Sequence, residues 1–414
     1  MKIVMSNITL LILADDLTGA LDTGIQFASH NISTGVLLSP NDAPPENCPA
    51  VLVINTATRH RSPAEARRIV SECIMHYPDA AHVYKKTDST LRGHIGAELE
   101  ALMETRHTKR LPFVPAYPDL GRCTRKGYQY LFGKPVHETG MALDPLNPVT
   151  SSFIPDIIGG ESLAAIKLFP AAAEIPDQES AGKEIFVFDS ETTEDLRHIA
   201  HDLYEKNLLM NSAGCAGFAE ALMEVLPFSR GPASAKQKIE KAAAILFVSG
   251  SLHPVSIAQV RAALDGGIFG ISVDWPLNME GEKISEALAE ILDNKKAALL
   301  CTRAALGEGQ KERASPEKIP RELGLLVKSI GLKNGPLCLV IFGGDTLLGI
   351  ANVLEINYIE PVEEIRPDIC RGVVLSRARS GSGDFLIVTK SGAFGPPEII
   401  SVILEYLGEH YARI

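Results

Sequence analysis

Short apolar runs alternate with amphipathic segments along most of the chain. The run at residues 8–14 (ITLLILA) has the length of a buried strand, and the segment after it places Leu17, Leu21 and Ile25 at helical spacing. Further strands are predicted at STGVLLS (33–39), AVLVINTAT (50–58), HVYKKTDS (82–89), RLPFVPAYP (110–118) and EIFVFDS (184–190). Helices are predicted at 63–76, behind the N-cap candidate Ser62, and at 93–103. This alternation is typical of βαβ units in a mostly parallel sheet.

Two α/β domains are predicted, at residues 1–230 and 240–414. The segment 228–241 (FSRGPASAKQKIEK) combines Gly, Pro, Ser and charged residues between two apolar segments, which is typical of a linker. After it the strand pattern resumes at 242–251, 267–274, 296–303, 337–346 and 384–395, and an apolar helix is predicted at 396–408. Residues 121–150 interrupt the first domain with a predicted hairpin and a long loop, which in a compact domain is more often functional than structural.

Composition and charge exclude several classes of protein. The 414 residues are 45% hydrophobic and 22% charged, which excludes disorder over the whole chain. The formal net charge of −11 argues against nucleic acid as the main partner, since phosphate neutralisation needs a basic face. No apolar run approaches the roughly 20 residues of a membrane helix, and the seven scattered cysteines form no Cys-x-x-Cys pair. We therefore expect a soluble cytoplasmic protein that uses no membrane and no metal-ligating cysteines.

Two clusters in the first half follow predicted strands. Asp15 and Asp16 come directly after the first strand, where ligands bind in open α/β sheets. One acid can cap the next helix, and a second needs a compensating cation or ligand. The segment KKTDSTLRG (85–93) carries Lys85, Lys86 and Arg92, the hydroxyls of Ser89 and Thr90, and Gly93 for close backbone approach. With a helix N-terminus after it, this segment is suited to a carboxylate or phosphate with neighbouring hydroxyls.

A third polar cluster lies in the interrupting segment. Arg122, Thr124, Arg125 and Lys126 add basic and hydroxyl groups, and the pair His137-Glu138 is an acid–base candidate that is more often structural in a loop. In the second half, the strand ends SGS (249–251), GGDT (343–346) and KSGAFG (390–395) place small residues where backbone N–H groups can hold phosphate oxygens. Walker A, dinucleotide and protein-kinase patterns are absent, so a nucleotide site must be of another kind.

The ordered set ADDLTGALDTG, KKTDSTLRGHIGAEL, PAYPDLGRCTRKG, HETGMALDPLNPV, SGSLHPVSIAQ, GGDTLLGIA and TKSGAFG resembles the four-carbon acid sugar kinases. The resemblance runs from near residue 10 to near residue 396. It implies a sugar-acid-binding N-terminal domain, an ATP-binding C-terminal domain, an active site in the cleft between them, and transfer of the γ-phosphoryl group to the C4 hydroxyl. On the family pattern the substrate side holds Asp15, Asp16, Lys86, Asp88, Ser89 and Arg92, and the ATP side holds Ser251, Gly343, Gly344, Asp345, Thr346 and Gly392.

The expected reaction uses ATP with Mg²⁺ and no metal held by the protein alone. Asp16 is the candidate that accepts or orients the C4 hydroxyl proton, with Asp15 or Asp88 as the alternative holder of that hydroxyl or of a metal-bound water. Arg92 and Lys86 are expected to bind the carboxylate of threonate, erythronate or a 3-oxo-tetronate. The chain departs from the family pattern at Leu252-His253-Pro254 and at Gly392-Ala393.

Other functions stay open on the residues alone. A kinase of the same fold could act on a five-carbon or branched sugar acid. An ATP-dependent ligase and a dehydrogenase are weaker readings, and the missing dinucleotide pattern argues against the second. A sugar-acid or nucleotide sensor without catalysis is the alternative from another class. The C-terminal helix could serve the core or an interface in a homo-oligomer, and the core is favoured.

Overall fold

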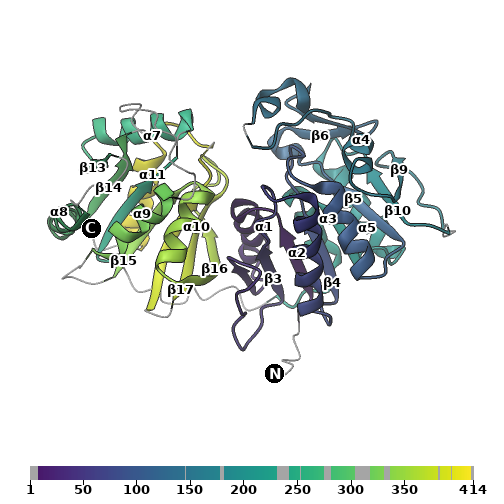
Figure 1. Cartoon of the computed structure of the whole chain (residues 1–414), viewed down its shortest axis with the longest axis horizontal. Helices are drawn as coiled ribbons and strands as arrows, with labels where there is room; N and C mark the ends of the chain where they lie inside the picture. The colour runs from purple at the N-terminus through teal and green to yellow at the C-terminus, as the bar shows by residue number, and fades with distance from the viewer. Residues whose placement is uncertain are drawn as a thin grey trace. The chain divides into compact units, whose positions relative to one another are not determined.

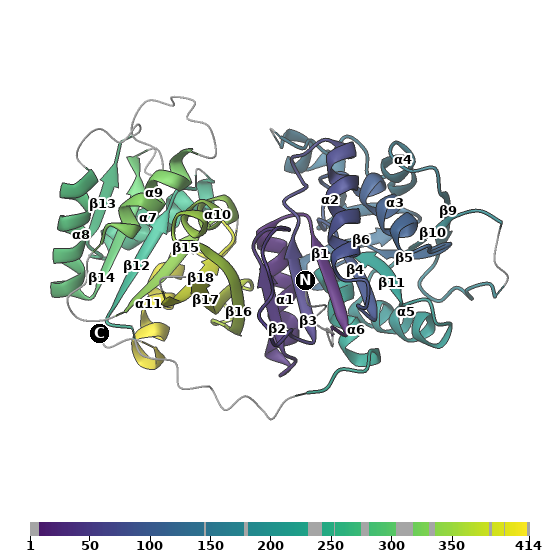
Figure 2. The ribbon, with the colours of Figure 1, turned by 60° about the horizontal axis from the view of Figure 1, so that its bottom comes forward.

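The computed structural model describes residues 8–411 except 145, 178–180, 231–241, 252, 275–280, 304–317, 331–335, 381–382 and 393. The chain divides into two compact units, residues 1–231 (unit 1) and 232–414 (unit 2). Most of the segment 228–241 that the sequence marks as a linker lies outside the described residues. Figures 1 and 2 show that each unit has its own sheet with helices packed on it.

Unit 1 is built on a parallel sheet in the order β2-β3-β1-β4-β11-β5-β10-β9. Its strands are β1 (Leu10–Ala14), β2 (Thr34–Leu37), β3 (Val51–Asn55), β4 (His82–Lys86), β5 (Arg110–Val114), β9 (Ala165–Phe169), β10 (Glu184–Phe188) and β11 (Asn211–Gly214). Every residue of β1 and β3 is buried, because helices cover both faces of the sheet. The sequence pattern predicted β1–β5 and β10 and missed β9 and β11.

Helices cover the two faces of this sheet in two groups. They are α1 (Leu17–Ser29), α2 (Pro63–His76), α3 (Ile95–Thr105), α4 (Ile154–Gly159), α5 (Thr193–Glu205) and α6 (Ala216–Val225). The helices α2, α3 and α4 pack together, and α1, α6 and α5 form the second group, as Figure 2 shows. The predicted helix at 63–76 is confirmed, and Ser62 caps it in a capping box with Glu65.

The hairpin predicted within residues 121–150 is confirmed, and a third short strand extends it to a small separate sheet. The strands β6 (Arg122–Arg125), β7 (Tyr128–Leu131) and β8 (Lys134–Pro135) pair antiparallel, and short 3₁₀ turns follow at Val136–Glu138 and Gly140–Leu143. Thr124 lies in β6 and is buried, where its hydroxyl donates to the Gln129 carboxamide at 2.6 Å. This part of the predicted polar cluster therefore holds the small sheet together.

Unit 2 has a mixed sheet in the order β13-β14-β12-β15-β18-β17-β16. The strands are β12 (Ala244–Ser249), β13 (Gly270–Val273), β14 (Ala297–Thr302), β15 (Leu337–Phe342), β16 (Ile356–Glu364), β17 (Val373–Ser380) and β18 (Gly383–Lys390). The sequence predicted the strands that pair in parallel, which are β12, β13, β14, β15 and β18. The antiparallel strands β16 and β17 were missed, since their charged residues alternate with apolar ones and give no continuous apolar run.

The helices of unit 2 are α7 (Pro254–Asp265), α8 (Gly281–Lys295), α9 (Lys318–Lys328), α10 (Gly344–Val353) and α11 (Ile399–His410). The helices α8, α9 and α10 pack in a row, whereas α7 packs on α11. The C-terminal helix belongs to the core, as favoured from the sequence, because Ile399, Ile403 and Leu407 are fully buried in it. In the described part of the chain, none of the helices combines the length and apolar composition needed to cross a membrane.

Candidate active site

Four neighbouring strands of unit 1 end at one level of the sheet. Ala14 at the end of β1 is in register with Asn55 of β3 and Lys86 of β4, and Lys86 is in register with Gly214 of β11. The helix after β1 lies in one group of helices and those after β3 and β4 lie in the other. Adjacent parallel strands whose connections leave to opposite faces form a topological switch point, which is where ligands bind in open α/β sheets.

Asp15 and Asp16 follow β1 and have different roles. Asp16 is the N-cap of α1, and its Oδ1 accepts from the Gly19 N–H at 3.0 Å. Its side chain keeps 27% of its surface exposed, whereas that of Asp15 is only 2% exposed. Oδ1 of Asp15 has no hydrogen-bond partner among the described residues. Of the two acids, Asp16 is therefore the one that a ligand can reach.

Arg59, which the sequence analysis did not select, joins three carboxylates at this edge. Its Nε lies 2.7 Å from Asp15 Oδ2, Nη1 lies 2.9 Å from Asp16 Oδ2, and Nη2 lies 3.5 Å from Asp88 Oδ1. Burial would raise the pKa of Asp15, but Arg59, Lys85 and Lys86 outweigh it and lower that pKa. Burial by itself would lower the pKa of Arg59, and the three carboxylates raise it well above its usual value. The adjacent acids Asp15 and Asp16 had led us to expect a compensating cation. No spacing in the sequence identified Arg59 as that cation.

The two lysines at the end of β4 are both buried, contrary to the usual solvated position of a Lys-Lys pair. Lys85 is fully buried and its ammonium lies 3.1 Å from Glu98 Oε2, so it is not available to a ligand. Lys86 is 5% exposed and donates to the Thr87 carbonyl at 2.7 Å. A Cβ at position 19 would lie 2.9 Å from Lys86 Nζ, which places this ammonium against the first turn of α1.

Asp88 and Arg92 form a paired unit. The Arg92 guanidinium donates to both oxygens of Asp88 at 3.0 Å, and its Nη1 donates to Asp144 Oδ2 at 3.2 Å. Burial would raise the pKa of Asp88, but the charges of Arg92 and Arg59 hold it well below its usual value. The Arg92 side chain is 26% exposed, so it lies at the surface of the site with part of its charge already balanced.

The helix after Ser89 begins later than the sequence suggested. Helix α3 starts at Ile95, and Ser89 and Thr90 lie in a turn whose fold is set by Asp88, which accepts from the Thr90 N–H at 3.2 Å. Leu91 has φ 66° and Gly93 has φ 90°, so the chain reverses twice before the helix begins. Ser89 is half-buried, and no helix N–H follows it directly. The predicted helix at 93–103 is confirmed and begins two residues later than expected, because a turn occupies the residues between Ser89 and its start.

Of the polar residues in the interrupting segment, Asp144 and Arg122 interact with the Asp88–Arg92 unit, whereas Arg125, His137 and Glu138 make their contacts elsewhere. Arg125 is exposed and pairs with Glu191, and the ring of His137 contacts Ser152 at 2.8 Å. His137 and Glu138 lie 3.8 Å apart at the surface. Within the described part of the chain, these side chains contact residues outside the Asp15–Asp88 group, which agrees with a structural role for the His-Glu pair.

Three strands of unit 2 also end together. Ser249 of β12 is in register with Phe342 of β15, and Phe342 with Lys390 of β18. The helix after β12 and the helix after β15 belong to different groups, so these adjacent strands form a second switch point. The Gly343 N–H donates to the Lys390 carbonyl at 2.8 Å, which ties the two loops together.

The glycine loops at these ends have no room for side chains. A Cβ at position 392 would lie 2.8 Å from Ser251 Oγ, and one at position 250 would lie 3.0 Å from Thr346 Oγ1. Gly343 has φ 94°, which favours glycine, and it is the N-cap of α10. Two of the predicted ATP-side residues, Ser251 and Gly392, therefore lie in loops beside the start of α10, whose N-cap and first turn hold the others, Gly343, Gly344, Asp345 and Thr346.

Lys390 lies beneath these loops. It belongs to the motif KSGAFG (390–395) but was not among the predicted site residues. The residue is 2% exposed, and its ammonium donates to the carbonyls of Ser391 and Phe394. Burial lowers the pKa of Lys390 to about 8. Of the departures from the family pattern, Leu252 and Ala393 lie outside the described residues, and His253 caps α7 with its Nδ1 3.2 Å from the Val255 N.

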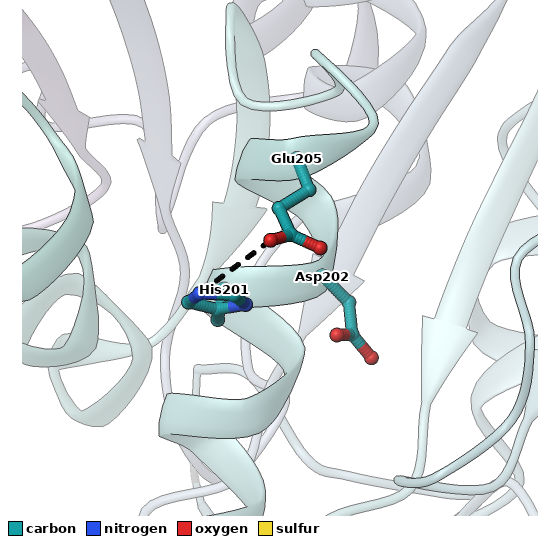
Figure 3. A group of neighbouring side chains, drawn as sticks. All are labelled: His201, Asp202 and Glu205. Atoms are coloured by element: carbon teal, nitrogen blue, oxygen red, sulfur yellow. Dashed lines mark ion pairs between the residues drawn. The ribbon is translucent and has the colours of Figure 1, made fainter.

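Among the described residues, one group of three His, Cys, Asp or Glu side chains has ligand atoms within 4.8 Å of one another. It is His201, Asp202 and Glu205 on α5. Figure 3 shows His201 and Glu205 facing each other across one helix turn, with Asp202 to the side. The His201 Nε2 lies 3.7 Å from Glu205 Oε1. Two of the three are exposed, and none follows a strand end, so this group is an ordinary helix-surface arrangement.

Comparison with known proteins assigns the two units to known domains. A model described as a sugar-binding N-terminal domain matches residues 10–222, and one described as a nucleotide-binding C-terminal domain matches residues 246–400. The fold is similar to solved structures of a Salmonella typhimurium protein described as a putative tRNA synthase (TM-score 0.78, 22% identity) and of a Haemophilus influenzae protein (TM-score 0.74, 18% identity). The first covers 96% of this chain and 99% of that one, and the second 96% and 100%.

Curated relatives match over nearly their full length. The chain is 28% identical to a D-threonate kinase of Salmonella typhimurium, covering 97% of this chain and 99% of the relative. It is 28% identical to a D-erythronate kinase of Heliobacterium modesticaldum, covering 97% of each. It is 24% identical to a 3-oxo-tetronate kinase of Methylobacterium radiotolerans, covering 95% and 98%. With both domains matched in order, the chain belongs to the four-carbon acid sugar kinase family.

Proposed function

We propose that this protein transfers the γ-phosphoryl group of Mg-ATP to the C4 hydroxyl of a four-carbon acid sugar. Unit 1 binds the sugar acid and unit 2 binds ATP. The observation that carries the proposal is the contrast between the two switch points. The first gathers carboxylates, cations and hydroxyls, as a hydroxy acid requires, and the second gathers glycines and small hydroxyl residues, as phosphates require. The names of the curated relatives point to threonate, erythronate and 3-oxo-tetronate as the substrate class.

Asp16 is the group that accepts or orients the proton of the attacking hydroxyl. It is the more exposed acid of the Asp15-Asp16 pair, and Arg59 and the first turn of α1 hold its two oxygens. Asp15 is buried and Asp88 is bound by Arg92, so both serve to fix the charges around Asp16. Phosphoryl transfer depends mainly on positioning and charge neutralisation, so an oriented carboxylate is sufficient for this role.

The sugar-acid carboxylate binds near Arg92 and Lys86, with the hydroxyl of Ser89 and the open backbone at Gly93 beside them. Arg92 is partly exposed and has N–H groups beyond those given to Asp88 and Asp144. A Cβ at position 93 would lie 3.5 Å from Asp15 Oδ2, so Gly93 leaves the approach to the acids open. The carboxylate thereby binds at the Arg92 end of the group and the C4 hydroxyl at the Asp16 end, with the Lys86 ammonium beside Asp16.

Backbone N–H groups of the loops from Gly343 to Thr346 and at Gly392, with the Ser251 hydroxyl, bind the ATP phosphates. The N-terminus of α10 favours an anion there. Mg²⁺ in kinases is held by one or two carboxylates together with phosphate oxygens, and the exposed Asp345 carboxylate in the first turn of α10 fits that donor set. When bound, Mg²⁺ neutralises the phosphate charge. The proposal places this ATP-dependent reaction in the cytoplasm. It also includes self-association of the chain into a homo-oligomer.

The test is a coupled assay of ADP release with Mg-ATP and a panel of sugar acids. The panel contains D- and L-threonate, D- and L-erythronate, 3-oxo-tetronates, and five-carbon acids as controls. Turnover with one four-carbon acid and a phosphate ester at C4, located by ³¹P–¹H NMR, is the expected result. Turnover restricted to a longer or branched acid would move the substrate but keep the mechanism. ATP binding without turnover of any acid would reject the kinase proposal and favour a sensor.

A further inference from the structure

A buried ion pair lies directly beneath the acids of unit 1. The Lys85 ammonium is 3.1 Å from Glu98 Oε2, and the two side chains are 0% and 3% exposed. Replacing a buried ion pair by apolar residues of similar volume is often neutral or stabilising. The pair is therefore poorly explained by stability alone.

The hydrogen bonds of the pair lead to the backbone that carries the site. Lys85 Nζ donates to the Leu13 carbonyl at 3.2 Å and to the Lys86 carbonyl at 2.9 Å. Leu13 precedes Asp15 by two residues, and Lys86 precedes Asp88 by two. One ammonium thus links the ends of β1 and β4 at the points where both chains leave the sheet.

Glu98, the acidic partner of the pair, connects to the segment that follows β3. Glu98 on α3 accepts from the Thr58 hydroxyl, which contacts the Thr56 hydroxyl at 2.8 Å, and Thr56 donates to the Ala14 carbonyl at 2.8 Å. Thr58 directly precedes Arg59. The residues Thr56, Thr58, Lys85 and Glu98 are all buried, so none of them reaches a ligand. We call these four residues the buried network.

We propose that the buried network is a positioning device that sets the relative places of Asp15, Asp16, Arg59 and Asp88 for phosphoryl transfer. This inference rests on the proposed function of the same site. The network fixes carbonyl oxygens one or two residues before the acids, and it contains the residue directly before Arg59, so a shift of α3 against the sheet moves the acids. Reacting groups need placement within about 0.5 Å, and a misplacement of about 1 Å can cost on the order of 10²-fold in rate.

The network also contributes charge. Lys85 is one of the cations that lower the pKa of Asp15, together with Arg59 and Lys86, and Glu98 faces the same group from α3. Burial raises the pKa of Glu98, and Lys85 opposes that rise. Removing the pair should therefore change the acid side of the pH profile as well as the rate.

The decisive variant is Lys85→Met/Glu98→Leu, which replaces the pair by apolar side chains of similar size. We expect an unfolding midpoint equal to or above that of the wild type, a fall in kcat of roughly 10- to 100-fold, and an unchanged KM for ATP. The acidic limb of the kcat/KM profile for the sugar acid should move to higher pH. If kcat stays within about twofold of the wild type while the variant is folded, the positioning role is rejected.

A matched control exists on the same helix. Glu100 of α3 is also buried and pairs with Lys183, but its other hydrogen bond goes to Ser162, away from the strand ends. The variant Lys183→Met/Glu100→Leu should leave kcat and the pH profile unchanged. An equal loss in both double variants would show that α3 packing, not the network, controls the rate, and would overturn the proposal.

Two further measurements keep the test decisive. If the double variant does not fold, Glu98→Gln keeps the size of the side chain and its acceptor for Lys85 but loses the acceptor for Thr58, and a fall in kcat is expected. The acidic limb should not move to higher pH in this variant, because Lys85 keeps its charge. A crystal structure of either variant should show the Asp15 and Asp16 carboxylates displaced by about 0.5 Å or more. Unmoved carboxylates would overturn the proposal. If the wild type turns over no sugar acid, the proposed function fails, and this structural comparison still decides the positioning role.

Discussion

Arg59 Nε lies 2.7 Å from Asp15 Oδ2, and both side chains are almost fully buried. The two residues come from the ends of neighbouring strands, and 44 positions separate them in the sequence. A charge pair at this depth is costly to break, since removal of one partner leaves an uncompensated buried charge. The pair therefore sets both the stability and the electrostatics of this end of unit 1.

The variant Arg59→Lys should destabilise the protein by about 3 kcal/mol at pH 7, because a lysine point charge cannot serve three carboxylates as the guanidinium fork does. The folded pKa values of Asp15 and Asp88 lie below the ordinary 3.8, so their stabilisation is present above that value and is lost as the pH falls through the folded pKa. In urea unfolding, the difference in unfolding free energy between variant and wild type should be largest at neutral pH. Arg197→Lys, at an exposed pair with Glu224, is the control and should leave the unfolding free energy essentially unchanged. If that difference in unfolding free energy grows as the pH falls, the stabilisation of the folded state by Arg59 and these carboxylates is contradicted.

The variant Asp16→Asn should lower kcat by roughly 10²-fold or more and leave KM for ATP unchanged. Asparagine caps a helix as well as aspartate does, so this change removes the charge and keeps the cap of α1. Asp16→Ala should lose the cap as well, at about 1 kcal/mol. Steady-state kinetics and thermal unfolding separate the two effects. Thr192→Ala, which removes the cap of α5, should cost stability and leave kcat intact. Near-normal turnover of Asp16→Asn would exclude Asp16 as the proton acceptor.

The variant Arg92→Ala should raise KM for the sugar acid by roughly tenfold or more, because a charge-assisted contact to the substrate carboxylate is lost. ATP affinity should stay within about twofold. Asp144→Asn removes only one partner of Arg92 and should have a much smaller effect. Isothermal titration with the sugar acid alone measures this directly. An unaltered sugar-acid affinity in Arg92→Ala would remove Arg92 from the carboxylate site.

The variant Gly392→Ala should raise KM for ATP by roughly tenfold, because the new Cβ would lie 2.8 Å from Ser251 Oγ and 3.3 Å from Ser256 Oγ and must displace them. Sugar-acid affinity should not change. Gly281→Ala in α8 is the matched control, since a Cβ there would meet only Leu326 at an ordinary 3.7 Å. Nucleotide titrations of both variants provide the comparison. Equal ATP affinity in the two would place the phosphates elsewhere.

Lys390 predicts a pH effect on stability. Its folded pKa of about 8 lies below the ordinary 10.5, so the folded state binds fewer protons between these values than the unfolded state does. Stability from this group therefore rises with pH over that window, by roughly 1 to 3 kcal/mol. Lys390→Met should abolish the rise. The check is the difference in unfolding free energy between wild type and variant at pH 7.5, 9 and 10. A difference that stays constant would contradict the burial of a charged ammonium here.

The parallel part of both sheets could be predicted from the sequence because buried strands are continuous apolar runs. Residues 8–14 and 337–342 are of this kind, and the capped helix at 63–76 carried its own start signal in Ser62. The strands β16 and β17 gave no such signal, because Glu side chains interrupt β16 and Arg side chains interrupt β17. Glu360 and Arg379 pair across the antiparallel ladder. Their place in the sheet depends on partners that lie elsewhere in the chain.

The candidate site also depends partly on local sequence and partly on tertiary structure. By itself, the sequence determined which segments follow strand ends and which of them carry acids, hydroxyls or glycines, because those properties are local. Only the tertiary structure decided that Lys85 is bound to Glu98 while Lys86 stays beside Asp16, and that Arg59 serves three carboxylates. These facts depend on strand order and on helix packing. Neighbours in the sheet come from distant parts of the sequence, and burial decides which charges must be paired.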